Sequence, residues 1–226
     1  MKKLFLVGAL ALFGAINAQT TFGAKAGYAL SQMNSDDEDD MEFEGIGVDK
    51  KSKSGFYVGG FVEHKLTDKF ALQGELQYAE LGGRYQGKLQ ESGYHATLNM
   101  DFKINQILVP ISAKYYPTAN FSLSAGPYLG FVVSNKFEAK FKDSNLPKEV
   151  IAEANAELSE YNEMFSDSFD ESLQKVTFGL HVGAEYTIYK GLLIDARYNF
   201  GLSNLEKDTN TSTKMSFFQV GLGYKF

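Results

Sequence analysis

Apolar and polar residues alternate along eight stretches of the chain, and a period of two is typical of a β-strand with one apolar face. The last stretch shows the pattern clearly, with Phe218, Val220, Leu222, Tyr224 and Phe226 on one face. The eight predicted strands span residues 22–30, 56–62, 70–78, 107–115, 121–131, 178–186, 192–200 and 218–226. Their number, length and alternation predict an all-β fold, an eight-stranded antiparallel up-and-down β-barrel.

The connections between the predicted strands alternate between short and long. Three of them are tight turns around residues 67–69, 117–120 and 189–191, whereas the connections on the other side are much longer. Short periplasmic turns and long extracellular loops are typical of transmembrane barrels, in which an even strand number leaves both termini in the periplasm. The spacing therefore predicts a barrel that spans an outer membrane.

Alternation alone also fits a soluble lipocalin-like barrel, whose apolar face points inward. The 13 Tyr and 19 Phe residues favour a membrane barrel, because many of them gather at both ends of the predicted apolar face. At the turn side they are Phe70, Tyr115, Phe121, Tyr186 and Tyr224, and at the loop side Tyr28, Phe56, Tyr78, Phe131, Phe178, Phe200 and Phe218. Aliphatic residues such as Val58 and Leu123 lie between them. Two aromatic belts around an aliphatic band match the two interfaces of a bilayer.

The first 18 residues predict a signal peptide, because Lys2 and Lys3 precede a short apolar run that ends at the small residue Ala18. Residues 19–226 then form the barrel domain. Without the two lysines, 20 basic residues face 28 acidic ones, a net charge of −8. This balance argues against a nucleic-acid partner, which needs a basic surface. The absence of Cys excludes disulfides and cysteine-ligated metals.

The segment 217–226 ends on Tyr224 and Phe226 and resembles the signal that is read by the outer-membrane barrel assembly machinery. The chain also resembles the PorT-like outer-membrane β-barrel family of Bacteroidetes. The stretches that carry this likeness are Gly55–Gly60, Gly74–Tyr78, Val109–Tyr116, Ser124–Gly130 and Asp195–Leu202. The resemblance implies a barrel in the outer membrane of a Gram-negative bacterium, with lipid as its surroundings. It brings neither a catalytic motif nor a cofactor.

The face opposite the apolar one points into the predicted lumen and carries charges of both signs. These residues are Lys25, Glu63, Glu75, Lys114, Glu185, Asp195 and Arg197. They would form either an ion path or a core of paired charges. The paired core is favoured, because an eight-stranded barrel is only wide enough for its side chains to fill.

The first long loop holds five adjacent carboxylates, Asp36, Asp37, Glu38, Asp39 and Asp40. Such a cluster has the oxygen ligands that Ca²⁺ prefers. The run lacks the glycine of an EF-hand loop, because Met41 stands at its sixth position. A solvated acidic loop is therefore favoured over a metal site.

The third long loop, about residues 134–175, contains the clearest non-β pattern. Its apolar residues recur at steps of three and four, which predicts an amphipathic helix over about 147–172, with Pro147 in its first turn. The stripe consists of Val150, Ala154, Leu158, Tyr161, Phe165 and Phe169. It would either pack over the barrel mouth or dock a partner protein, for which Leu158, Tyr161, Phe165 and Phe169 are the candidates.

An enzymatic function would have to use one of the three His residues. The nearest approach to a catalytic pair is His95 with Asp101, which the strand assignment places in the second long loop. Nothing in the sequence orients a nucleophile and a base. The sequence therefore predicts a non-enzymatic outer-membrane protein that is structural or binds partners through its extracellular loops. A narrow porin-like channel and an outer-membrane hydrolase are the alternatives, the hydrolase being the weaker.

Overall fold

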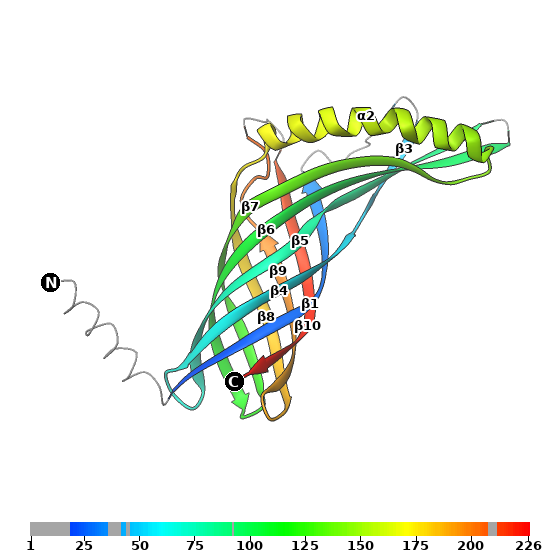
Figure 1. Cartoon of the computed structure of the whole chain (residues 1–226). Coiled ribbons are helices and arrows are strands. Elements are labelled where there is room, and N and C mark those ends of the chain that lie inside the picture. The colour runs from blue at the N-terminus through cyan, green and yellow to red at the C-terminus, as the bar shows by residue number, and fades with distance from the viewer. Residues whose placement is uncertain (1–18, 36–41, 44–45, 92, 208–211) are drawn as a thin grey trace.

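The computed structural model describes residues 19–35, 42–43, 46–91, 93–207 and 212–226, and Figure 1 shows them as a closed barrel with a long extension at one end. The predicted signal peptide and the acidic run 36–40 lie outside the described residues. The strands of the barrel are β1 (Thr20–Ser35), β4 (Lys53–Lys65), β5 (Phe70–Glu91), β6 (Tyr94–Thr118), β7 (Phe121–Ser144), β8 (Val176–Tyr189), β9 (Leu192–Gly201) and β10 (Thr213–Lys225).

Each barrel strand pairs antiparallel with its neighbour in the sequence, and β1 pairs with β10 to close the ring. The predicted eight-stranded up-and-down barrel is therefore confirmed. Closure matters in a bilayer, because lipid offers no partner for the backbone groups of a free sheet edge. Figure 1 shows that the start of β1 and the C-terminus lie at the same end as the short turns.

The two faces of each strand have opposite character. On β5, Leu76 is 61% exposed, whereas its neighbours Glu75 and Gln77 are 4% and 2% exposed. Aromatic rings of adjacent strands touch on the outer surface at both ends of the barrel. Phe70 and Tyr115 lie 5.3 Å apart between ring centroids near the turns, and Phe56 and Tyr78 lie 5.9 Å apart nearer the extension. The outer surface is thus apolar with aromatic contacts toward both ends, as expected of a surface that faces lipid.

The turn between β8 and β9 shows how the short connections are built. Lys190 and Gly191 have φ angles of 43° and 89°, the left-handed pair that matches the twist of a two-residue hairpin. A β-carbon at Gly191 would lie 2.3 Å from the Lys225 carbonyl oxygen. Glycine is therefore required there both by its φ angle and by the close approach of β10.

The extension corrects the predicted loops. Residues 79–106, expected to be a long loop, continue β5 and β6 as a hairpin, and residues 134–144 continue β7. Two short strands, β3 (Ile46–Lys51) and β2 (Glu42–Phe43), pair at its other side. Glycines and charged residues interrupt the apolar alternation here, and Gly82, with φ of 138°, marks an irregular point on β5. The period of two was therefore hidden although the strands continue.

The predicted helix is confirmed as α2 (Lys148–Ser172), and Pro147 stands just before its first turn. Figure 1 shows α2 lying along the extension and returning toward the barrel mouth. A helix of 25 residues rises about 37 Å at 1.5 Å per residue, enough to lead the chain from the tip of β7 back to β8. Among the described residues, no helix is long and apolar enough to cross a bilayer.

One face of α2 pairs with the free edge of β7. Beyond Phe131, β7 has no β8 partner, so its outward N–H and C=O groups need other partners. Asn162 accepts a hydrogen bond from the Ala139 amide at 2.8 Å and donates one to the Ala139 carbonyl at 3.1 Å. Asn155 does the same at Phe141, and Ser166 does so at Phe137. We call these three helix residues the amide ladder.

Replacing Asn162 by Leu tests the ladder. Two hydrogen bonds are lost, each worth about 0.5–1.5 kcal/mol net, so hydrogen exchange at the Ala139 amide should accelerate about tenfold or more. The measurement is amide exchange on the protein in lipid nanodiscs. Glu163→Leu, an exposed position one residue along the helix, is the matched control and should leave exchange unchanged. Equal rates in the two variants would show that Asn162 does not hold the helix to the strand.

Candidate functional site

The turn-side half of the lumen is filled by ion pairs centred on Lys114. Its Nζ donates to Glu63 Oε2 at 2.6 Å, to Gln73 Oε1 at 2.9 Å and to Glu185 Oε1 at 3.0 Å. Lys25 lies 3.0 Å from the other oxygen of Glu185. These residues come from five different strands, because the ring brings inward-facing positions of distant strands to a common centre.

A second group of contacts continues this network. Arg197 donates to Glu75, and the Tyr57 hydroxyl donates to Asp195 at 2.8 Å. All seven lumen residues named from the sequence therefore point inward, and each is buried. Sequence reasoning missed Lys225, whose Nζ lies 2.6 Å from Glu185 and 3.3 Å from Glu63. Its position in the alternation, between the outward-facing Tyr224 and Phe226, was the signal that could have found it.

We call these side chains the lumen network: Lys25, Tyr57, Glu63, Gln73, Glu75, Lys114, Glu185, Asp195, Arg197 and Lys225. The space left between Lys25, Gln73, Lys114, Glu185 and Arg197 is about 10 Å³. A single water molecule needs roughly 10–15 Å³, so this space holds at most about one water molecule. Opposite charges alternate across the network, which offsets the cost of burying them.

An apolar layer lies above the lumen network, toward the extension. Buried residues from several strands form it, and Tyr128 and Phe217 contact each other edge-on at 5.7 Å between ring centroids. Ile104 and Leu81 are fully buried within it. The lumen is thus filled by polar pairs at the turn side and by hydrocarbon at the mouth side.

Above the apolar layer, the barrel mouth and the extension line a half-open cavity of about 760 Å³, which we call the mouth cavity. Met33 and Met100 contribute to its wall, together with the rings of Phe102, Phe137 and Phe169. Phe102 lies 4.9 Å from Phe137 and 5.2 Å from Phe169 between ring centroids, so the wall is a packed aromatic cluster. The sequence pattern did not reveal this cavity, because its residues come from segments far apart in the chain.

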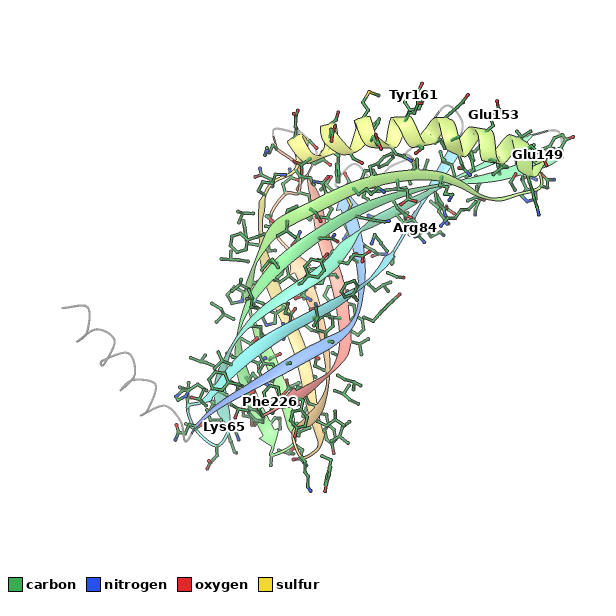
Figure 2. The ribbon with its side chains drawn as sticks, viewed as in Figure 1. Lys65, Arg84, Glu149, Glu153, Tyr161 and Phe226 are labelled. Atoms are coloured by element: carbon green, nitrogen blue, oxygen red, sulfur yellow. The ribbon has the colours of Figure 1, made fainter. Side chains whose placement is uncertain are left out.

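The apolar stripe predicted on α2 is divided between different surroundings. Phe169 packs against the apolar layer, and Phe165 lies 5.1 Å from Phe137 between ring centroids. Leu158 is half-buried. Tyr161 is 61% exposed, and Figure 2 shows it with Glu149 and Glu153 on the side of α2 away from the barrel. The C-terminal part of the stripe therefore packs at the barrel mouth, whereas the face of α2 that meets β7 is the amide ladder, offset from the stripe. Docking of a partner through Leu158, Tyr161, Phe165 and Phe169 stays a prediction.

The remaining candidates are not assembled into a site. His95 and Asp101 lie on β6, not on an unanchored loop, and Asp101 is paired with Arg84 through Nη2 at 3.0 Å. The Asp36–Asp40 run lies outside the described residues, and among the residues described no group of His, Asp and Glu side chains is arranged to hold a metal ion. Tyr224 and Phe226, the predicted assembly signal, are exposed with ring centroids 5.6 Å apart.

Ion pairs also hold the extension outside the barrel. The Lys103 ammonium on β6 donates to Glu138 on β7 at 3.0 Å, and this hydrogen bond lowers the pKa of the Glu138 carboxyl. At the end of α2, the pKa of Asp170 is lowered by the hydrogen bonds that it accepts from Lys175 and Asn135. The first contact joins two strands of the extension, and the second joins the end of α2 to β7 and to the segment before β8.

A closed eight-stranded ring with an apolar outer surface and a filled polar lumen defines a transmembrane β-barrel protein. The family model described as "Outer membrane protein beta-barrel domain" matches residues 17–207, so the chain belongs to this family and to the outer membrane.

Solved structures with a similar fold include three bacterial proteins. Ail, the attachment invasion locus protein of Yersinia pestis, is 17% identical with a TM-score of 0.45, covering 92% of this chain and 99% of that one. Neisserial surface protein A is 15% identical with a TM-score of 0.47, covering 91% and 97%. OprG from Pseudomonas aeruginosa is 16% identical with a TM-score of 0.42, covering 92% and 96%. No curated protein sequence matches the chain.

The lumen network predicts a strong coupling between Arg197 and Glu75. Arg197→Met leaves a buried carboxylate without its guanidinium partner, which should cost about 3–5 kcal/mol of the free energy of unfolding. The double variant Arg197→Met/Glu75→Gln removes both charges and should recover part of this loss. Urea unfolding in lipid vesicles measures both. Lys103→Met, at a pair that is about one third exposed, should cost less than about 1 kcal/mol. A double variant that is no more stable than Arg197→Met would contradict the coupling.

Proposed function

We propose that this protein is a non-enzymatic outer-membrane barrel that binds partners at its extracellular end and does not conduct solutes through its lumen. The observation that carries the proposal is the filled lumen, in which ion pairs and an apolar layer occupy successive levels of the barrel. A solute that crossed it would have to break several buried ion pairs. The porin-like alternative is therefore disfavoured, and nothing in the described residues supports the hydrolase.

The extension supports a role in binding at the cell surface. Strands β5, β6 and β7 continue well beyond the barrel, and the amide ladder covers their edge instead of leaving it free. This construction gives a stable platform, which a passive barrel would not need. Functional residues commonly sit on such projecting elements above a rigid scaffold.

The exposed side of α2 supports a partner of particular chemistry. It carries Glu153, Glu157 and Glu160 next to the exposed ring of Tyr161 and the exposed side chain of Met164. Carboxylates around an aromatic residue favour a protein partner with basic residues, since complementary charge steers association and an aromatic anchor adds affinity. We also propose that the chain is related to the PorT-like proteins of Bacteroidetes. The five strand segments that match this family support the proposal.

Recordings in planar lipid bilayers test the sealed lumen. The purified protein should give no steady conductance steps, because the buried ion pairs of the lumen network occupy the interior of the barrel. A second variant lacks the extension of β7 and the helix, residues 134–174; Val132 and Lys175 already share a backbone hydrogen bond of 2.9 Å, so the ends meet without strain. It should also remain closed. Large, steady steps from the intact protein would overturn the proposal in favour of a channel.

Site-specific cross-linking tests the surface role, because the chain has no natural Cys. Tyr161→Cys, labelled with a photoreactive group on intact cells, should yield a discrete cross-linked partner. Thr67→Cys, in the turn between β4 and β5 at the opposite end of the barrel, is the matched control and should not yield it. Cross-links that are absent from Tyr161→Cys, or equal at both positions, would contradict a partner at α2.

A further inference from the structure

The mouth cavity is lined by other residues than those on the exposed side of α2. Its 760 Å³ lies within the range of about 300–1,000 Å³ that is typical of small-molecule sites. The wall is mostly apolar: methionine chains and four phenylalanine rings form it, together with Tyr85 and Val48. Water gains few hydrogen bonds in such surroundings, so an apolar guest is favoured over solvent.

We propose that the mouth cavity binds a small apolar molecule with an uncharged polar end, such as a long-chain alcohol. The proposal deepens the surface-binding function and rests on it. The polar groups that line the cavity are the hydroxyls of Ser35, Ser168, Ser172 and Thr213 and the Glu206 carboxylate. Hydroxyls and a carboxylate accept hydrogen bonds from an alcohol. Neither Lys nor Arg is among the lining residues that the structure describes, so an anionic end would be buried there without a counter-charge.

The mouth cavity is closed on the side that faces the lumen, so a bound molecule would be held there and would not pass through the barrel. Met33 belongs both to its wall and to the buried apolar layer, where Leu173, Leu205 and Met215 are also buried. The lumen network lies beneath that layer. A guest that enters from the extracellular end therefore stops at the mouth and cannot continue toward the periplasm.

The cavity is also held open by contacts that do not depend on a guest. Phe165 and Phe169, on the wall, lie on the same helix that the amide ladder fixes to β7. Tyr85 contacts Phe102 edge-on at 5.8 Å between ring centroids, which extends the aromatic cluster of the wall to β5. A preformed site avoids the entropic cost of ordering its walls on binding.

Because the chain contains no Trp, single tryptophans can report on the cavity. Phe169→Trp and Tyr85→Trp place a reporter on each of two walls, and Tyr161→Trp places one on the exposed side of α2 as a control. The probe is a terminally brominated dodecanol, titrated into the protein in nanodiscs, since bromine quenches tryptophan on contact. The two cavity reporters should be quenched with saturation at low probe concentration. The control should show only weak quenching that rises linearly.

A filled cavity provides the second comparison. Ser172→Phe, added to either cavity reporter, should lower the affinity for the probe about tenfold or more. The phenyl ring takes the space of two or more methylene groups of the probe, which then cannot be buried. Ser159→Phe, the same change at an exposed helix position, should not. Folding of every variant is checked by comparing the gel migration of heated and unheated protein. If one of the two reporter variants does not fold, the other one is used.

Three results would overturn the proposal: linear quenching of both cavity reporters, no effect of Ser172→Phe, or equal affinity for brominated dodecanoate at pH 8. Equal affinity for the anion would remove the charge selectivity, and the other two would remove the site. This readout is independent of conductance and of cross-linking. If the barrel conducts and quenching is saturable, the proposed function is refuted and the binding site remains. If the barrel is closed and quenching is not saturable, the binding site is refuted and the closed lumen remains.

Discussion

The structure depends on one constraint: every backbone N–H and C=O group that faces lipid must be paired within the protein. Within the barrel the ring satisfies it, because β1 and β10 close the sheet along thirteen residue pairs from Gly23 to Ser35. Beyond the membrane the constraint relaxes, since water can pair with backbone groups. The chain nevertheless extends β5, β6 and β7 outward and covers the free edge of β7 with side chains of α2. The extension is therefore a built element and not a loose loop.

The same closure determines what the lumen can do. Eight strands leave an interior only wide enough for side chains, so the inward positions must fill it or leave voids. Charged residues fill the turn side in pairs, and hydrocarbon fills the mouth side. In a barrel that is filled in this way, the surfaces available for binding lie at the end of the extension, namely the mouth cavity and the exposed side of α2.

Sequence alternation predicted the ring and its inward residues, because the period of two assigns each side chain to a face without knowledge of its contacts. Lys25 and Glu185 could be placed in the lumen in this way, but their contact could not, since it depends on the register of the three successive strand pairings that lead from β1 through β10 and β9 to β8. The extension was missed where Gly82 and Gly83 interrupt the pattern. The amide ladder was missed because Asn155 and Asn162 look like ordinary polar positions of a helix until a free strand edge lies beside them.

The relation between the ladder and the apolar stripe explains why α2 has two roles. At 3.6 residues per turn, Phe165 and Phe169 lie to one side of the direction defined by Asn162 and Ser166. The polar face therefore meets β7, while the C-terminal end of the stripe reaches the mouth cavity. A helix bound through its apolar stripe would have closed the cavity and left the edge of β7 unpaired. Attachment through amides instead holds the helix in place and leaves apolar side chains available to a guest.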